Sequence, residues 1–208
     1  MKPIILFDFD GTLADSVSLG IDLLNTYAGK FGYRTIDCEK SKGLSALQLM
    51  GVAGIRFWKL PYLMCFFRKK IAEQAAQIQL ISGVGELLAE LRKSDFELGI
   101  LTSNSAATVT AFLHKYGLES YFSYVKTDVS LFGKKRAIRS ARRKTGKSIV
   151  YVGDELRDVE ACRKTGTPVV SVSWGFNTAD VLERSNPGCV AETADAAFTL
   201  IRKLAAGI

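Results

Sequence analysis

Histidine, paired cysteines and long apolar runs are scarce in this 208-residue sequence, and each shortage narrows the possible chemistry. The single histidine, His114, falls within a predicted helix, where we expect a structural role. The four cysteines are widely spaced and form no Cys-x-x-Cys pair. This spacing argues against a zinc site or a dense disulfide framework. Buried, reduced thiols in the cytosol are the expectation.

No stretch of the sequence is both apolar enough and long enough to predict a membrane span. The most membrane-like stretch, residues 55–67, is too short and contains two cationic residues and a proline. We expect it to form a buried or partner-facing helix, with a segment lying at a membrane surface as the alternative. The N-terminus lacks the layout of a signal peptide, because Asp8 and Asp10 interrupt its apolar run. A cytoplasmic location is therefore expected.

Positive charge is in excess, with 28 Lys and Arg against 21 Asp and Glu. Much of the excess lies in residues 134–147. Solubility is one explanation for this charge, and attraction of an anionic substrate such as a phosphate ester is the other. No aromatic side chains interleave with the basic run, so a nucleic-acid partner is not predicted.

The most informative stretch is Asp8-Phe9-Asp10-Gly11-Thr12, which follows an apolar run at residues 4–7 that predicts a buried strand. Residues two apart on a strand point the same way, so Asp8 and Asp10 would reach the same site. Two facing carboxylates repel unless a cation or a shared proton lies between them. Oxygen ligands suit Mg²⁺. An aspartate-rich turn that only closes the strand is the alternative.

Three later segments also fall where a predicted strand ends or a helix begins. The strand at 96–101 is followed by Thr102-Ser103-Asn104-Ser105, and the strand at 148–152 by Gly153-Asp154-Glu155-Leu156-Arg157-Asp158. Between them, Gly133-Lys134-Lys135 opens a basic helical segment. These motifs, in this order across residues 3–175, resemble those of the haloacid dehalogenase (HAD) superfamily of phosphatases.

The resemblance implies roles for the acidic residues. Asp8 would be the nucleophile and Asp10 the general acid and base. A Mg²⁺ ion would be held by the Asp8 carboxylate, the Asp10 backbone carbonyl and Asp154. Asp158 would contact the metal directly or support its ligands, and the alternative is an acid that only favours the dipole of a helix in its first turn.

Other residues would bind the phosphoryl group and the substrate. Ser103 would donate to the phosphoryl oxygens, and the backbone amides at Asn104 and around Phe9 would form an anion-binding nest. Gly11 and Thr12, in the first acidic motif, are also expected to bind substrate. Lys134 would neutralise charge on the nucleophile. Because Lys135 replaces the proline of the family's Gly-Lys-Pro, the choice between the two lysines stays open, with Lys134 preferred.

The order of elements predicts an α/β fold. After residue 80, strands alternate with helices, which implies a Rossmann-like parallel sheet covered on both faces. Residues 15–80 contain no good strand and predict helices at 17–31, 45–52 and 55–79. An all-helical insert after the first strand resembles the cap of HAD phosphatases. We therefore expect a core domain of residues 1–14 and 81–208 and a helical cap of residues 15–80.

Substrate choice rests on two loops. Lys42 lies in a basic, glycine-containing stretch that looks like the specificity loop of phosphoglycolate phosphatases and β-phosphoglucomutases. Residues 173–177 resemble a Trp/Tyr-Gly loop of phosphoglycolate phosphatase relatives. The expected function is Mg²⁺-dependent hydrolysis of a small phosphorylated metabolite by a monomer or homodimer, with no nucleic-acid or membrane partner. A phosphosugar mutase and a non-catalytic binding protein are the alternatives.

Overall fold

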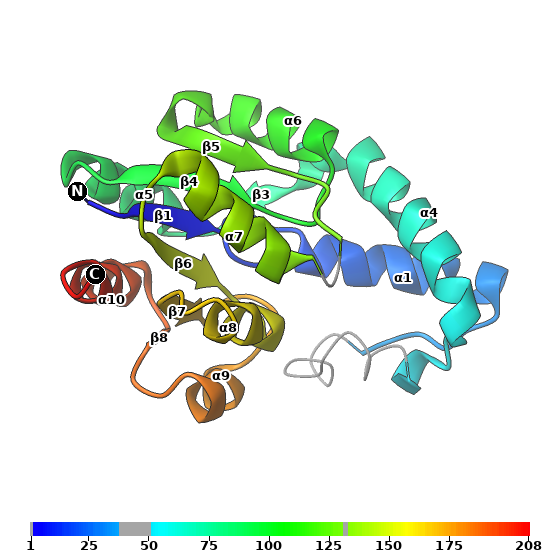
Figure 1. Ribbon diagram of the computed structural model, residues 1–208. Coiled ribbons are helices and arrows are strands. Elements are labelled where there is room, and N and C mark those ends of the chain that lie inside the picture. The colour runs from blue at the N-terminus through cyan, green and yellow to red at the C-terminus, as the bar shows by residue number, and fades with distance from the viewer. Residues whose placement is uncertain (1, 38–50, 131–132) are drawn as a thin grey trace.

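The computed structural model describes residues 2–37, 51–130 and 133–208 and contains one six-stranded parallel sheet (Figure 1). Its strand order is β5-β4-β1-β6-β7-β8, with β1 near the middle. The strands are β1 (Ile4–Phe7), β4 (Glu97–Leu101), β5 (Phe122–Lys126), β6 (Ile149–Gly153), β7 (Val169–Val172) and β8 (Val190–Ala191). The strands predicted at 4–7, 96–101 and 148–152 agree with β1, β4 and β6 to within one residue at each end, and β8 was not predicted.

Both faces of the sheet are buried, which is why its inner strands read as continuous apolar runs. On β1, Ile5 and Phe7 face a core built with α5, α6 and α10, while Ile4 and Leu6 face a second core built with α7 and α8. These helices are α5 (Val84–Lys93), α6 (Ala106–Tyr116), α7 (Lys134–Thr145), α8 (Leu156–Arg163) and α10 (Ala194–Ala205), and α9 (Ala179–Ser185) lies beside α8. The prediction of a Rossmann-like α/β core is confirmed.

Glycine ends two of these helices. Gly117 follows α6 with a φ of 64°, and Gly146 follows α7 with a φ of 66°. Such left-handed backbone strains most other residues, so glycine at this position stops a helix at low cost. The local sequence therefore specifies where these two helices end.

The segment between β1 and α5 is mainly helical in the described residues. It contains α1 (Val17–Phe31), α4 (Leu60–Glu73) and short 3₁₀ helices at Phe57–Lys59 and Ala75–Gln77. The prediction of a single helix over residues 55–79 is wrong, because α4 and the two 3₁₀ helices divide this stretch into three pieces. Strands β2 (Ala14–Asp15) and β3 (Gln79–Leu80), which were not predicted, pair antiparallel and join the two ends of the segment. The helix predicted over 45–52 lies mostly outside the described residues.

In Figure 1, α1 and α4 extend beyond the carboxyl ends of the parallel strands. This is the position that a cap over the site would take. The division into a core domain (1–14 and 81–208) and a cap (15–80) stays a prediction.

The apolar stretch 55–67 has both a packed and an exposed side. Phe66 and Phe67 pack against Tyr27 and Phe31 of α1, with the Phe66 and Tyr27 ring centroids 4.8 Å apart. Trp58 is exposed. Among the described residues, no helix has the length and apolar character needed to cross a membrane. Helix–helix packing thus explains the aromatic residues of this stretch only in part.

Cys65, Cys162 and Cys189 carry free thiols in the described part of the chain. Cys162 is buried in the core between the sheet and α8, as expected, whereas Cys65 is exposed. The expectation of buried thiols is therefore wrong for Cys65, because it lies on the outer side of α4.

The Phe112 side chain tests the packing between α6 and the sheet. Its ring is fully buried and meets the ring of Phe9 edge-on, with centroids 4.9 Å apart. We expect Phe112→Ala to lower the free energy of unfolding by about 3–5 kcal/mol, because it leaves a cavity in the core. Chemical denaturation would measure the change. His114→Ala, at an exposed position of the same helix, is the control and should change it by less than about 0.5 kcal/mol.

Candidate active site

The predicted catalytic motifs converge at the carboxyl edge of the sheet. Asp8 follows β1, residues 102–105 follow β4, and Asp154 follows β6. Lys134 begins α7, whose N-terminal end lies at the same edge. Parallel strands bring their carboxyl ends to one side of the sheet, and this explains how residues more than a hundred positions apart meet.

Lys134 forms the centre of the site. Its ammonium group is buried and donates to Oδ2 of Asp8 and to Oδ1 of Asp158. Burial alone would lower the pKa of Lys134, but the two carboxylates outweigh it and the pKa is raised. Lys135 is exposed to solvent. The geometry therefore places Lys134, and not Lys135, against the predicted nucleophile.

Three buried carboxylates form a cluster that could hold a metal. One oxygen each of Asp8, Asp154 and Asp158 lies within 4.8 Å of the others. Burial, and then the neighbouring acids, raise the pKa of Asp154 well above its usual range. The pKa of Asp158 is raised to about 6 by burial, against the effect of Lys134. A set of crowded, buried oxygen donors fits the preference of Mg²⁺.

Asp154 is held by neighbours on both of its oxygens. The Thr12 hydroxyl donates to Oδ1 at 2.9 Å, and the Phe176 backbone N–H donates to Oδ2 at 2.7 Å. A Cβ on Gly11 would lie 2.2 Å from Oδ2 of Asp154, and one on Gly175 would lie 2.3 Å from the same atom. Gly11 and Thr12, which the sequence assigned to substrate binding, are thus placed against Asp154.

Asp10 lies beside this cluster. Its Oδ1 accepts hydrogen bonds from Ser16 Oγ at 2.5 Å and from Asn104 Nδ2 at 2.8 Å. Burial raises the pKa of Asp10, and these two hydrogen bonds partly offset the effect. The carboxyl group of Asp10 is not one of the three in this acidic cluster. A role for its backbone carbonyl as a metal ligand stays a prediction.

The segment after β4, residues 102–105, carries three hydroxyl groups. Ser103 is half-buried, and no hydrogen bond of its side chain is found among the described residues. Thr102, which sequence reasoning did not single out, is fully buried and its hydroxyl accepts from the Asn104 N–H at 3.0 Å. The sequence feature that could have identified Thr102 as a candidate site residue is its position directly after the end of β4. Ser105 caps α6.

The proposed anion nest is already hydrogen-bonded within the chain. The Asn104 amide donates to Thr102, and the Phe9 amide donates to Oδ1 of Asp8 at 2.8 Å. Asp158 lies in the first turn of α8, accepts from the Glu155 N–H at 3.3 Å and contacts Lys134. Its role toward a metal ion stays a prediction. Lys42 lies outside the described residues.

The loop after β7 also reaches the site. The Trp174 indole N–H donates to the carbonyl oxygen of Thr12 at 3.2 Å. The side-chain oxygen of the buried Asn177 accepts from the Leu156 N–H at 2.9 Å, at the start of α8. This loop therefore supports both Asp154 and α8.

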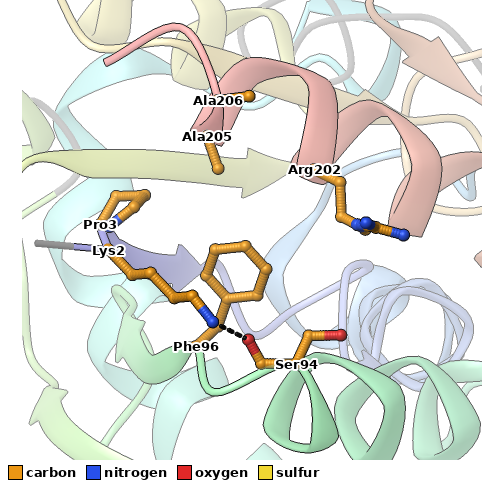
Figure 2. A pocket seen from close by; sticks show the side chains of 7 residues that line it. All are labelled: Lys2, Pro3, Ser94, Phe96, Arg202, Ala205 and Ala206. Atoms are coloured by element: carbon orange, nitrogen blue, oxygen red, sulfur yellow. Dashed lines mark hydrogen bonds between the residues drawn. The ribbon is translucent and has the colours of Figure 1, made fainter.

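A hollow of about 640 Å³ lies at the start of β1, whereas the candidate site lies at the carboxyl end of that strand (Figure 2). Lys2 and Arg202 line it together with the Phe96 ring, and Lys2 donates to the backbone oxygen of Ser94 at 2.7 Å. None of its lining residues belongs to the catalytic motifs. This hollow is therefore separate from the candidate site at the carboxyl edge of the sheet.

Comparison with protein families identifies the chain. The model of the haloacid dehalogenase-like hydrolases matches residues 5–172. The chain belongs to this family. The match confirms the family resemblance and, with it, the prediction of a HAD-type phosphatase.

Relatives of this HAD hydrolase cover nearly its whole length. A phosphoglycolate phosphatase of Synechococcus elongatus is 38% identical over 195 residues, which is 91% of this chain and 92% of the relative. The tyrosine-protein kinase PtkA of Mycobacterium tuberculosis is 25% identical over 92% of this chain and 69% of the relative. The crystal structure of a predicted phosphatase from Clostridium acetobutylicum matches with a TM-score of 0.80 at 23% identity, covering 98% and 99% of the two chains. The similarity to the Clostridium acetobutylicum structure shows that the two proteins share a fold.

Gly175 allows a prediction about the support of Asp154. A methyl group there would lie 2.3 Å from Asp154 Oδ2 and 2.3 Å from the carbonyl oxygen of Gly11. We expect Gly175→Ala to lower phosphatase activity on the order of 10²-fold, because it displaces Asp154. Steady-state kinetics would measure the loss. Gly29→Ala, on an exposed turn of α1 with no atoms within 4 Å of the added methyl group, is the control and should retain activity.

Proposed function

We propose that this HAD hydrolase is a Mg²⁺-dependent phosphatase that hydrolyses a small phosphate monoester through an aspartyl-phosphate. The observation that carries the proposal is the buried Asp8 carboxylate, which contacts Lys134 and lies with Asp154 and Asp158 in one cluster. A carboxylate so placed is oriented by its neighbours and shielded from water, as a nucleophile needs to be.

In the first step, an oxygen of Asp8 forms a bond to phosphorus as the bond from phosphorus to the ester oxygen breaks. The leaving alkoxide takes a proton from Asp10. Among the described residues, the hydrogen bonds to Asp10 use only its Oδ1, so Oδ2 is left for this transfer. General acid catalysis of this kind contributes about 10²- to 10⁴-fold.

In the second step, water attacks the phosphorus of the aspartyl-phosphate and gives its proton to Asp10. The bond between phosphorus and Asp8 then breaks, which releases inorganic phosphate and restores the carboxylate. Lys134 stays beside Asp8 through both steps and balances negative charge on the reacting groups.

Asp8, Asp154 and Asp158 would hold the Mg²⁺ ion, together with the Asp10 backbone carbonyl that the family resemblance implies. Mg²⁺ would neutralise negative charge on the phosphoryl oxygens. The hydroxyl of Ser103 is proposed to bind these oxygens. Thr102 is the competing donor, since it lies directly at the end of β4.

The substrate is proposed to be a small phosphorylated metabolite resembling 2-phosphoglycolate. The 38% identity to a phosphoglycolate phosphatase over nine-tenths of both chains supports this class. The helical segment past the strand ends supports it too, because such a cap encloses a small substrate better than a large one (Figure 1). Lys42 remains a candidate for contact with a substrate carboxylate.

The test is phosphate release from a panel of monoesters that includes 2-phosphoglycolate. Release should require Mg²⁺, and Asp8→Asn should reduce it to the background rate, because an amide is a poor nucleophile. Circular dichroism of the variant would show that it is folded. If the wild-type enzyme released phosphate from no ester but interconverted a phosphosugar in the presence of its bisphosphate, a mutase would replace the proposed phosphatase. Full activity of Asp8→Asn would contradict the aspartyl-phosphate.

The adjacent lysines allow a matched comparison. We expect Lys134→Ala to lower kcat on the order of 10²-fold or more, because the variant loses the buried cation beside Asp8. Lys135→Ala removes the same charge from the exposed side of α7 and should change kcat less than about twofold. Equal losses in the two variants would mean that only the overall positive charge of this helix matters.

A further inference from the structure

Arg157 lies in the first turn of α8, immediately before Asp158. Its side chain is 27% exposed, so it reaches solvent but is largely covered by protein. One terminal nitrogen of the guanidinium donates to Glu155 Oε1 at 2.5 Å. The pair holds the guanidinium in place without using all of its donors.

The Nε–H of Arg157 is buried and has no hydrogen-bond partner among the described residues. The guanidinium stays protonated in proteins, so this donor cannot be removed by titration. A buried donor without an acceptor is costly, and native proteins rarely leave one unpaired. Water cannot reach this nitrogen in the present conformation, so the Nε–H would gain an acceptor only if the guanidinium shifts when a ligand binds.

The charge of Arg157 acts on the reacting groups of the site. Burial raises the pKa of Asp10 and of Asp158, and the charge of Arg157 opposes part of each rise. Asp8 and Glu155 in turn raise the pKa of Arg157, although burial works against this. Arg157 also adjoins Asp158, whose carboxylate contacts Lys134, so the first turn of α8 places the guanidinium beside the catalytic carboxylates.

An anionic substrate needs such a cation. Both contacts of Lys134 in the site are to carboxylates, Asp8 and Asp158. The surroundings also hold Asp10, Asp154 and Glu155. The proposed Mg²⁺ would offset part of this negative charge, and Arg157 would add to this effect on the side of Glu155. The planar fork of arginine also suits two oxygens of one anion, which a metal ion does not select by shape.

We propose that Arg157 is a substrate-binding residue whose Nε–H and neighbouring N–H donate to an oxyanion of the substrate, with Glu155 as the residue that positions it. This inference rests on the proposed phosphatase function and extends it to substrate recognition. The oxyanion belongs either to the phosphoryl group being transferred or to a second anionic group of the substrate, such as a carboxylate.

The experiment compares wild type, Arg157→Lys and Arg157→Met on two esters of similar size. 2-Phosphoglycolate carries a carboxylate, and 2-hydroxyethyl phosphate carries a neutral hydroxyl in its place. We expect KM for 2-phosphoglycolate to rise about 10- to 100-fold in Arg157→Met. Arg157→Lys keeps the charge but loses the fork, and it should show a smaller rise.

The two esters distinguish the sources of the oxyanion. If Arg157 binds the transferred phosphoryl group, KM rises equally for both esters, and inhibition by inorganic phosphate weakens by the same factor. If it binds a second anionic group, only 2-phosphoglycolate is affected and phosphate inhibition is unchanged. Either result supports the proposal.

Arg163→Met is the matched control, because Arg163 is exposed at the other end of α8 and bonds to the Ser185 carbonyl oxygen. It should leave KM unchanged, and thermal unfolding would show whether each variant is folded. If Arg157→Met does not fold, Arg157→Lys decides. An unchanged KM for both esters in a folded Arg157 variant overturns the inference, whereas a wild-type enzyme that hydrolyses neither ester, nor any other of the panel, contradicts the proposed function itself.

Discussion

The buried ammonium group of Lys134 is the interaction on which the arrangement of the site depends. It contacts Asp8 and Asp158. One carboxylate oxygen of each lies within 4.8 Å of the other and of an oxygen of Asp154. Without a nearby cation, buried carboxylates that lie so close to one another would take up protons or move apart. The same contacts join α7 and α8 to the end of β1. Losing the lysine would leave unpaired buried charge, which costs more than the pair contributes.

The sequence predicts those parts of the fold whose signals are local. The apolar run of β1 and the glycines after α6 and α7 each specify an element or its end within a few residues. Strands β2 and β3 escape such reasoning, because two residues are too few for a pattern and each exists only through its partner. The same holds for β8, which pairs with β7 at the edge of the sheet.

The site divides in a similar way. Asp8, Asp154 and Lys134 could be predicted because each carries a chemical group next to a strand end or a helix start. The residues that hydrogen-bond to them could not be predicted in this way. The contact of Phe176 with Asp154 joins residues 22 positions apart through a backbone amide, for which no residue type gives a signal. Thr12 has the right chemistry for binding a substrate, yet its hydroxyl donates to Asp154.

A substrate whose phosphoryl group meets Asp8 can extend in only one general direction, because the sheet lies behind that residue. The rest of the molecule must point away from the strand ends, toward the side on which α1 and α4 lie (Figure 1). Changes in that segment can therefore alter substrate choice without moving the carboxylates, and relatives with this core carry names as different as phosphatase and kinase. Arg157 is different, because α8 is packed on the core beside the metal position. Recognition by Arg157 would limit every variant of the helical segment to substrates with a correctly placed oxyanion.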